Sequence, residues 1–293
     1  MPNEANFSLE GFSAAISAAT ARAAERVVAI ESAGPWSVSG VLWRSGLVVT
    51  AHEGLPGDED FSVLLPDGRK TVASLIGRDP STDVALLKLD SGVWTDWAAA
   101  PTPQVGSLAL AVGRGEFGPL AAFGAVSEAG PAWRSLKGGL IDARLTLGLR
   151  LGGRLEGGAV VAPDGRLIGL AVSGPRGRAL AIPAVTVERA VKALGARGYV
   201  ARGYLGVSLH PLAGKGSSGG AIVVGLEPDG PAAKAGLAVG DIITTWDGEA
   251  VANVSSVSGR LGTDSVGHTV KLGVLRGGTA IDIDVTIGER PRA

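Results

Sequence analysis

The sequence contains no cysteine, which excludes disulfide bonds and thiolate metal sites but does not fix the cellular compartment. It also lacks any apolar run approaching the roughly 20 residues of a membrane-spanning helix. Its net charge is -1 with both signs interspersed, so it carries no charge footprint for nucleic acid or an anionic membrane surface. The opening residues, MPNEANFSLEG, are acidic and polar, and we expect no secretory signal there.

Glycine and proline are abundant instead, with 46 and 16 residues, and they separate many short runs of Val, Leu, Ile and Ala. Short apolar runs divided by turn residues are typical of β-rich folds. A chain of 293 residues also provides enough length for two domains with a sizeable core. We therefore predict a mainly β fold class.

Residues 26–97 and 104–198 each carry six such runs, and their spacing suits two small antiparallel β-barrels. Each barrel includes an Asp-Gly turn, at residues 66–69 and 163–166, of the kind that joins two strands. A helix at residues 185–194 is expected to follow the second barrel. The expected strands are residues 27–30, 38–43, 46–50, 61–65, 72–77 and 84–89, then 108–112, 122–128, 140–144, 159–161, 167–172 and 179–182.

Residues 1–25 form a separate N-terminal segment. Phe7, Phe12 and Ile16 recur there at roughly helical spacing, which predicts a helix. We expect this helix to dock on its own domain, and a role in oligomerisation is the alternative.

The stretch GGRLEGGAVV, residues 152–161, has the form of a serine-protease nucleophile loop that lacks its nucleophile. Such a loop presents a hydroxyl on a glycine-flanked turn, beside backbone N–H groups that hold an oxyanion. The pair Gly157 and Gly158 that would follow the serine is present, but Glu156 stands where the hydroxyl should be. A carboxylate forms no acyl-enzyme that turns over as a serine ester does, and its charge opposes a developing oxyanion.

Four collinear pieces within residues 26–198 resemble the two-barrel, trypsin-like domain of the HtrA/Deg serine protease family. They are SGLVVTAHEG, LPDGRKTVASLIGRDPSTDVALLKLD, GGRLEGGAVVAPDGRLIGLAV and ALAIPAVTVERAVKAL. Residues 199–293 resemble the PDZ domain that follows such a protease domain, through RGYLGV, GPAAKAGL and VGDII. The resemblance implies two six-stranded trypsin-like barrels followed by a PDZ domain.

The family's His, Asp and Ser can each be sought by position in this chain. Asp83, in the context STDVA, matches the family's aspartate. The family's Thr-x-x-His step reads Thr-Ala-His-Glu here, so Glu53 takes the base position and His52 falls one residue early. A one-residue deletion would place His52 there instead, and that alternative stays open. Arg154 and Leu155 replace a Gly-Asn pair that shapes the oxyanion loop, so the resemblance implies a degenerate triad.

The run GSSGGAI at residues 216–222 spells a Gly-x-Ser-Gly-Gly motif around Ser218, but no His or Asp precedes it at triad spacing, so a flexible hairpin loop is expected.

Glu53, Asp83 and Glu156 would converge and could hold Ca²⁺, Mg²⁺ or Mn²⁺. Pairing of these acids with nearby arginines, Arg150 and Arg154, is the expected alternative to a metal site.

The PDZ resemblance implies a peptide-binding groove. In such a domain the Tyr-Leu-Gly-Val loop offers backbone N–H groups to a peptide carboxylate, and the next strand pairs with the peptide. An opposing helix is expected at about residues 253–261. The implied peptide-binding residues are Tyr204, Leu205, Gly206, Val207, Ser208, Leu209, Val257 and Leu261.

These features together predict an HtrA/Deg-like pseudoprotease that binds peptide segments or protein C-termini as a scaffold, adaptor or regulator. An active serine endopeptidase and a metal-binding protein are the alternatives. We expect no cofactor, no nucleic-acid partner and no membrane span. The resemblance implies a possible homotrimer and suggests the periplasm or cell envelope, although the sequence itself does not specify the compartment.

Overall fold

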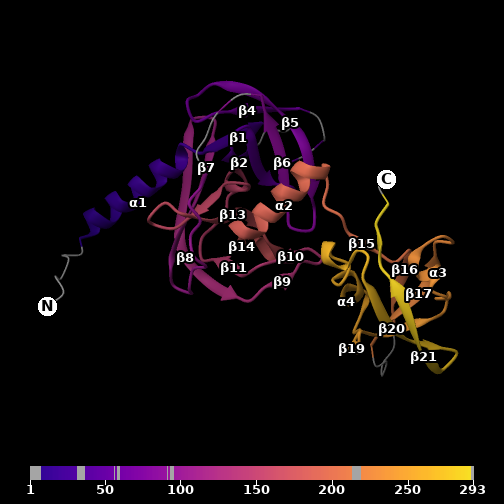
Figure 1. The fold of residues 1–293 in the computed structure, drawn as a ribbon. Coiled ribbons are helices and arrows are strands. Elements are labelled where there is room, and N and C mark those ends of the chain that lie inside the picture. The colour runs from indigo at the N-terminus through magenta and orange to yellow at the C-terminus, as the bar shows by residue number, and fades with distance from the viewer. Residues whose placement is uncertain are drawn as a thin grey trace. The chain divides into compact units, whose positions relative to one another are not determined.

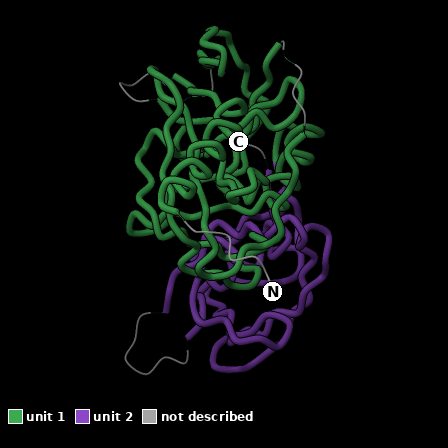
Figure 2. The backbone as a smooth tube through the Cα atoms, turned by 90° about the vertical axis from the view of Figure 1, so that its left-hand side faces the viewer, with its two compact units in different colours: residues 1–133, 141–199 green, residues 134–140, 200–293 purple. Residues whose placement is uncertain are grey.

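The computed structural model describes residues 8–31, 37–55, 57, 60–90, 92, 96–212 and 219–291 of the chain. It is mainly β, as predicted, with two closed six-stranded barrels and a third, open sheet (Figure 1). The chain divides into two compact units, residues 1–133 with 141–199 and residues 134–140 with 200–293 (Figure 2). No helix in the described part of the chain is long and apolar enough to cross a membrane.

The first barrel closes in the order β1-β2-β3-β6-β5-β4, with every neighbouring pair antiparallel. Its core is built from the inward residues of each strand, including Val28, Leu42 and Leu87, which are all fully buried. The predicted Asp-Gly turn joins β4 to β5. The strands are β1 (Val27–Glu31), β2 (Ser37–Arg44), β3 (Leu47–Ala51), β4 (Phe61–Leu64), β5 (Lys70–Asp79) and β6 (Val84–Leu89).

The second barrel closes in the order β11-β14-β13-β12-β7-β8. One predicted strand, residues 140–144, is divided here: Leu140–Ile141 pairs with Trp133–Arg134 in a small sheet of its own, and the barrel strand begins only at Arg144. The strands are β7 (Leu108–Gly115), β8 (Gly118–Gly130), β9 (Trp133–Arg134), β10 (Leu140–Ile141), β11 (Arg144–Leu147), β12 (Ala159–Val161), β13 (Leu167–Ser173) and β14 (Ala179–Pro183). Helix α2 (Ala184–Arg197) follows.

Helix α1 (Leu9–Ala24) begins at Ser8, whose hydroxyl accepts a hydrogen bond from the backbone N–H of Gly11. Ala19 and Ala23 are buried, and the ring of Phe12 packs edge-on against Phe123 of β8 with centroids 6.2 Å apart. The helix therefore contacts its own domain, in agreement with the expected docking.

The open sheet of the second unit has the strand order β16-β17-β18-β20-β21, which leaves β16 at an edge. Leu205, Ile243 and Leu272 lie in its apolar core. The short strands Gly203–Tyr204 and Gly288–Glu289 pair beside it. The elements are β15 (Gly203–Tyr204), β16 (Val207–Pro211), β17 (Ala221–Leu226), α3 (Pro231–Lys234), β18 (Ile242–Trp246), β19 (Glu249–Ala250), α4 (Val254–Ser258), η3 (Thr263–Ser265), β20 (Thr269–Arg276), β21 (Thr279–Thr286) and β22 (Gly288–Glu289).

Candidate functional site

Three strand ends of the barrel unit position the acids of the expected site. Glu53 follows β3, Asp83 precedes β6, and Glu156 precedes β12. Strands β3 and β6 are paired so that Ala51 lies opposite Val84, which brings the residues just beyond these ends together. The same pairing continues into the loop, because the backbone N–H of His52 donates to the carbonyl of Asp83 at 3.2 Å.

Asp83 contacts the main chain of Glu53. Its Oδ1 accepts a hydrogen bond from the backbone N–H of Glu53 at 2.8 Å. Asp83 itself has a φ of 59°, in the left-handed region that a short polar side chain tolerates better than other non-glycine residues do. The acid is thus held at a specific position by a tight turn between β5 and β6.

The imidazole of His52 contacts Arg78 of β5. Nη1 of Arg78 lies 3.3 Å from Nδ1 of His52, and the same guanidinium donates to the carbonyl oxygens of His52, Leu55 and Gly57. One arginine therefore fixes the loop after β3. The sequence analysis did not single out Arg78, since an arginine in an alternating strand carries no signal of such a role.

Glu156 has polar contacts within its own loop and with β13. Its Oε1 accepts from the backbone N–H of Ser173 at 3.2 Å. Its own backbone N–H donates to the carbonyl of Gly153 at 3.3 Å, because residues Gly153–Leu155 form a short 3₁₀ turn, η1. The Glu156 side chain also lies over Gly54, where a Cβ would be 3.6 Å from its Cγ.

The loop around Glu156 is anchored by Ser39, a fully buried residue of β2 that the sequence analysis missed. The Ser39 hydroxyl donates to the carbonyl of Arg154 at 2.6 Å, and its backbone N–H donates to the carbonyl of Glu156 at 2.9 Å. Gly157 packs directly against it at a φ of +77°, and a Cβ on Gly157 would come 2.3 Å from the carbonyl oxygen of Ser39. The first glycine of the Gly-Gly pair is thus required by space as well as by backbone conformation.

The three acids do not form a ligand set. Across the described part of the chain, no three His, Asp or Glu side chains are placed to hold a metal ion. The hypothesis of a cation bound by Glu53, Asp83 and Glu156 therefore has no support from the geometry. Ser218, the centre of the second Gly-x-Ser-Gly-Gly motif, lies outside the described residues.

The residues expected to form a peptide groove in the second unit lie on and beside β16, the edge strand of its described sheet. Gly206, at a φ of +74°, precedes it, and a Cβ there would lie 3.0 Å from Cα of Gly230, so the loop needs a glycine. Val207 and Leu209 are partly buried and alternate with the exposed Ser208. The nearby carboxylate of Glu227 raises the pKa of the Tyr204 hydroxyl.

The helix across from β16 is shorter than predicted. α4 spans Val254–Ser258 and is capped by Asn253, whose Oδ1 accepts from the backbone N–H of Ser256 at 3.0 Å. Gly259 follows the last turn. Val257 is buried in the domain core, whereas Leu261 lies beyond the helix and packs against that core while partly exposed.

Family models match both parts of the chain. A trypsin-like peptidase domain matches residues 38–170, and a PDZ domain matches residues 203–287. The "Probable periplasmic serine endoprotease DegP-like" of Brucella suis is 32% identical over 277 residues, which cover 86% of this chain and 52% of that protein. The chain is HtrA/DegP-like, with a trypsin-like peptidase domain followed by a PDZ domain. The "Periplasmic pH-dependent serine endoprotease DegQ" of Escherichia coli is 31% identical over 274 residues, covering 85% of this chain and 58% of that protein.

Solved structures resemble the HtrA/DegP-like chain over nearly its whole length. The HtrA-type protease AlgW with decapeptide matches with a TM-score of 0.73 and 26% identity, covering 94% of this chain and 99% of that one. The serine endoprotease from Yersinia pestis matches with a TM-score of 0.73 and 29% identity, covering 94% and 98%. The chain spans about half the length of the DegP-like relatives that it matches.

Proposed function

We propose that this HtrA/DegP-like chain is a pseudoprotease that binds peptide segments or protein C-termini through its PDZ domain, as a scaffold, adaptor or regulator. In this proposal the barrel unit keeps the shape of a peptidase domain without its chemistry. The PDZ domain supplies the binding function.

The environment of Glu156 is the observation that carries the first half of the proposal. A serine nucleophile needs a hydroxyl at this position, a base beside it and N–H groups directed at the oxyanion. Here the side chain is a carboxylate bound to the N–H of Ser173, and the backbone N–H of Glu156 already donates to Gly153. In addition, the backbone N–H of Glu53 donates to the carboxylate of Asp83, while the ring of His52 contacts Arg78. These contacts support the loss of nucleophile, base and oxyanion donor together.

The place of β16 at the edge of the described sheet supports the second half. An edge strand can add an extended peptide through main-chain hydrogen bonds. In the loop before β16, Gly206 has a φ of +74°, a conformation that favours glycine. Leu261 offers a partly exposed apolar side chain near helix α4. A free peptide carboxylate with an apolar last side chain is the ligand that such a groove would take.

Binding of labelled decapeptides to the full chain tests the proposal, with peptides that end in Val, Phe or Asp and carry either a free or an amidated C-terminus. We expect at least one apolar free-acid peptide to bind, and amidation to weaken it about tenfold or more, because a charge-assisted hydrogen bond is lost. Leu261→Ala should weaken binding several-fold. Val239→Ala is the matched control, because Val239 is 63% exposed and is not among the implied groove residues.

Two results would contradict the proposal. If free-acid and amidated peptides bind equally, or if no apolar free-acid peptide binds, carboxylate capture by the PDZ domain is wrong. If the purified chain cleaves casein and a serine-directed inhibitor abolishes the cleavage, the active endopeptidase alternative replaces the pseudoprotease.

A further inference from the structure

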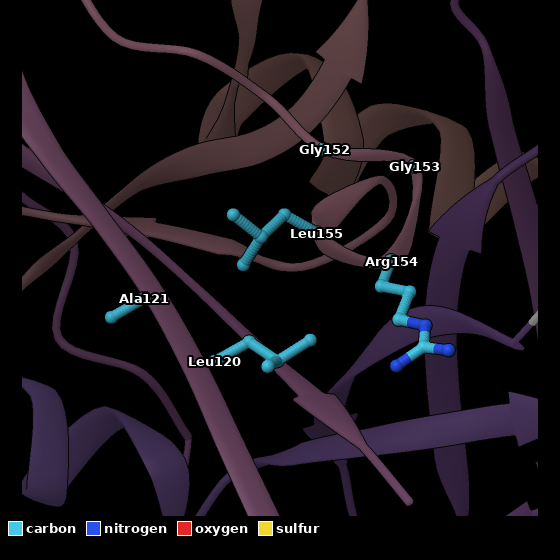
Figure 3. Close-up of a pocket in the computed structure, with 6 residues that line it drawn as sticks. All are labelled: Leu120, Ala121, Gly152, Gly153, Arg154 and Leu155. Carbon is cyan, nitrogen blue, oxygen red and sulfur yellow. The ribbon is translucent and has the colours of Figure 1, made fainter.

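A cavity of about 620 Å³ lies between β8 and the η1 turn of the barrel unit. Figure 3 shows the side chains of Leu155 and Leu120 extending toward this space from the two elements, with Arg154 reaching down the same side of the loop. Its lining residues are Leu120, Ala121, Gly152, Gly153, Arg154 and Leu155. Four of the six lining residues belong to the loop that precedes Glu156, but the lining includes none of the three acids of the candidate site and none of the expected peptide-binding residues.

We propose that this cavity binds a medium-chain alkyl carboxylate, such as a free fatty acid of about 8 to 12 carbons. The alkyl chain lies between Leu120 and Leu155, and the carboxylate pairs with the guanidinium of Arg154. The proposal goes beyond the pseudoprotease function and does not depend on it.

The chemistry of the lining selects this ligand class. Five of the six lining residues carry no polar side-chain atom: Leu120 and Leu155 contribute aliphatic side chains, Ala121 a methyl group, and Gly152 and Gly153 bare backbone. An aliphatic chain gains from such a wall through removal of apolar surface from water. The one charged group in the lining is the cation of Arg154, which is exposed and can reach a carboxylate that stays at the rim.

The two glycines keep the space open. A Cβ added to either Gly152 or Gly153 would meet no atom within 4 Å. Gly152 has ordinary extended backbone, with φ at -74° and ψ at 150°, so its conformation does not explain the glycine. Neither glycine is thus required by crowding around its Cα, in contrast to Gly157. Larger side chains at these two positions would project into open space along the cavity.

The size of the cavity sets the expected affinity and its dependence on chain length. A volume of 620 Å³ is within the range of small-molecule sites. A ligand of this size in an open site should bind with a Kd on the order of 0.1–1 mM. Each further buried methylene should tighten binding by about three- to fourfold until the chain outgrows the cavity.

Titration of the full chain with hexanoate, octanoate and decanoate, each below its micelle concentration, tests the proposal by NMR shifts of leucine methyl groups. We expect shifts at Leu120 and Leu155 and an affinity that rises with chain length. Gly153→Leu should fill the space and reduce decanoate binding at least fivefold. Ala121→Leu, from the opposite wall, gives the same test in a variant that leaves the η1 loop unchanged.

Arg154→Gln tests the role of the charge. It should weaken decanoate binding about three- to tenfold and leave decanol binding unchanged. Arg150→Gln is the matched control, since it removes the same charge from an exposed arginine that does not line the cavity. Three results would overturn the proposal: no methyl shifts with decanoate, equal affinity for hexanoate and decanoate, or equal losses in the Arg154 and Arg150 variants.

Discussion

Oδ1 of Asp83 lies 2.8 Å from the backbone nitrogen of Glu53, so this carboxylate is bound to the main chain of the residue that we propose for the base position. This contact does not require an imidazole. It gives Asp83 a structural role that persists in the absence of a catalytic partner, and it joins the turn before β6 to the loop after β3.

The role of Asp83 can be separated from catalysis by two substitutions. Asp83→Asn keeps an acceptor oxygen and a residue that tolerates a φ of 59°, so the free energy of unfolding should fall by less than about 1 kcal/mol. Asp83→Val removes the acceptor and places a β-branched residue in the left-handed region, which should cost about 2–4 kcal/mol. Chemical denaturation of both variants checks this prediction. Equal stability of the two would show that the contact with Glu53 is unimportant.

Gly157 and Gly152 form a matched pair within one loop. A Cβ on Gly157 would lie 2.3 Å from both the Ser39 carbonyl oxygen and the Thr50 hydroxyl, and φ is +77°. Gly157→Ala should therefore lower the thermal midpoint of the barrel unit strongly, by a destabilisation of about 2–4 kcal/mol. Gly152→Ala, with no atom within 4 Å, should change stability by less than about 0.5 kcal/mol. Similar effects of the two would contradict the packing described for this loop.

Arg78 should control the mobility of the loop after β3. Its guanidinium donates to the carbonyls of His52 and Leu55, at 3.3 and 2.7 Å. Arg78→Lys keeps the charge but loses the fork of donors, so backbone amides of residues 52–55 should exchange with deuterium about tenfold faster. Arg69→Lys is the control, because Arg69 pairs with Asp67 in an exposed turn and should leave those amides unchanged. If the amides of residues 52–55 exchange at the wild-type rate in Arg78→Lys, Arg78 does not control the mobility of this loop.

Asp241 of the PDZ domain predicts a pH dependence of stability. Bidentate hydrogen bonds from Arg276, at 2.8 and 2.7 Å, and then the N–H of Ala238 hold the pKa of the buried Asp241 carboxyl below its ordinary value. Because the folded state binds this proton more weakly than the unfolded state, the stabilisation is fully present above pH about 4 and is lost as pH falls through the lowered pKa.

Amide exchange of the PDZ core at pH 7 and at pH 3 measures this dependence in the full chain. In the wild type, the protection of these amides from exchange should be lower at pH 3 than at pH 7. Arg276→Gln should destabilise the domain by about 2–4 kcal/mol at pH 7 and flatten the fall below pH 4. If Arg276→Gln loses as much stability between pH 7 and pH 3 as the wild type does, the pH dependence does not come from the pair of Asp241 and Arg276.

The sequence predicted the barrels because each strand is a short apolar run, and because the Asp-Gly turns at residues 66–69 and 163–166 mark hairpins. The family resemblance implied the triad positions, Glu53 or His52 with Asp83 and Glu156, and these assignments stay predictions. The sequence could not predict the hydrogen bonds made there, since contacts such as Ser39 with Arg154 join residues over 100 positions apart. The division of residues 140–144 was missed for a related reason, as its first two residues pair with Trp133–Arg134 instead of the barrel.

Labelling of the wild-type chain with a fluorophosphonate probe, beside Glu156→Ser and Ser218→Ala, tests the pseudoprotease proposal most directly. We predict no labelling of the wild type. We also expect Glu156→Ser to remain unlabelled. The substitution restores a hydroxyl but no base, and the backbone N–H of residue 156 still donates to the carbonyl of Gly153 and not to an oxyanion. Labelling of the wild type would contradict the proposal, and its loss in Ser218→Ala would assign the nucleophile to the second glycine-serine motif.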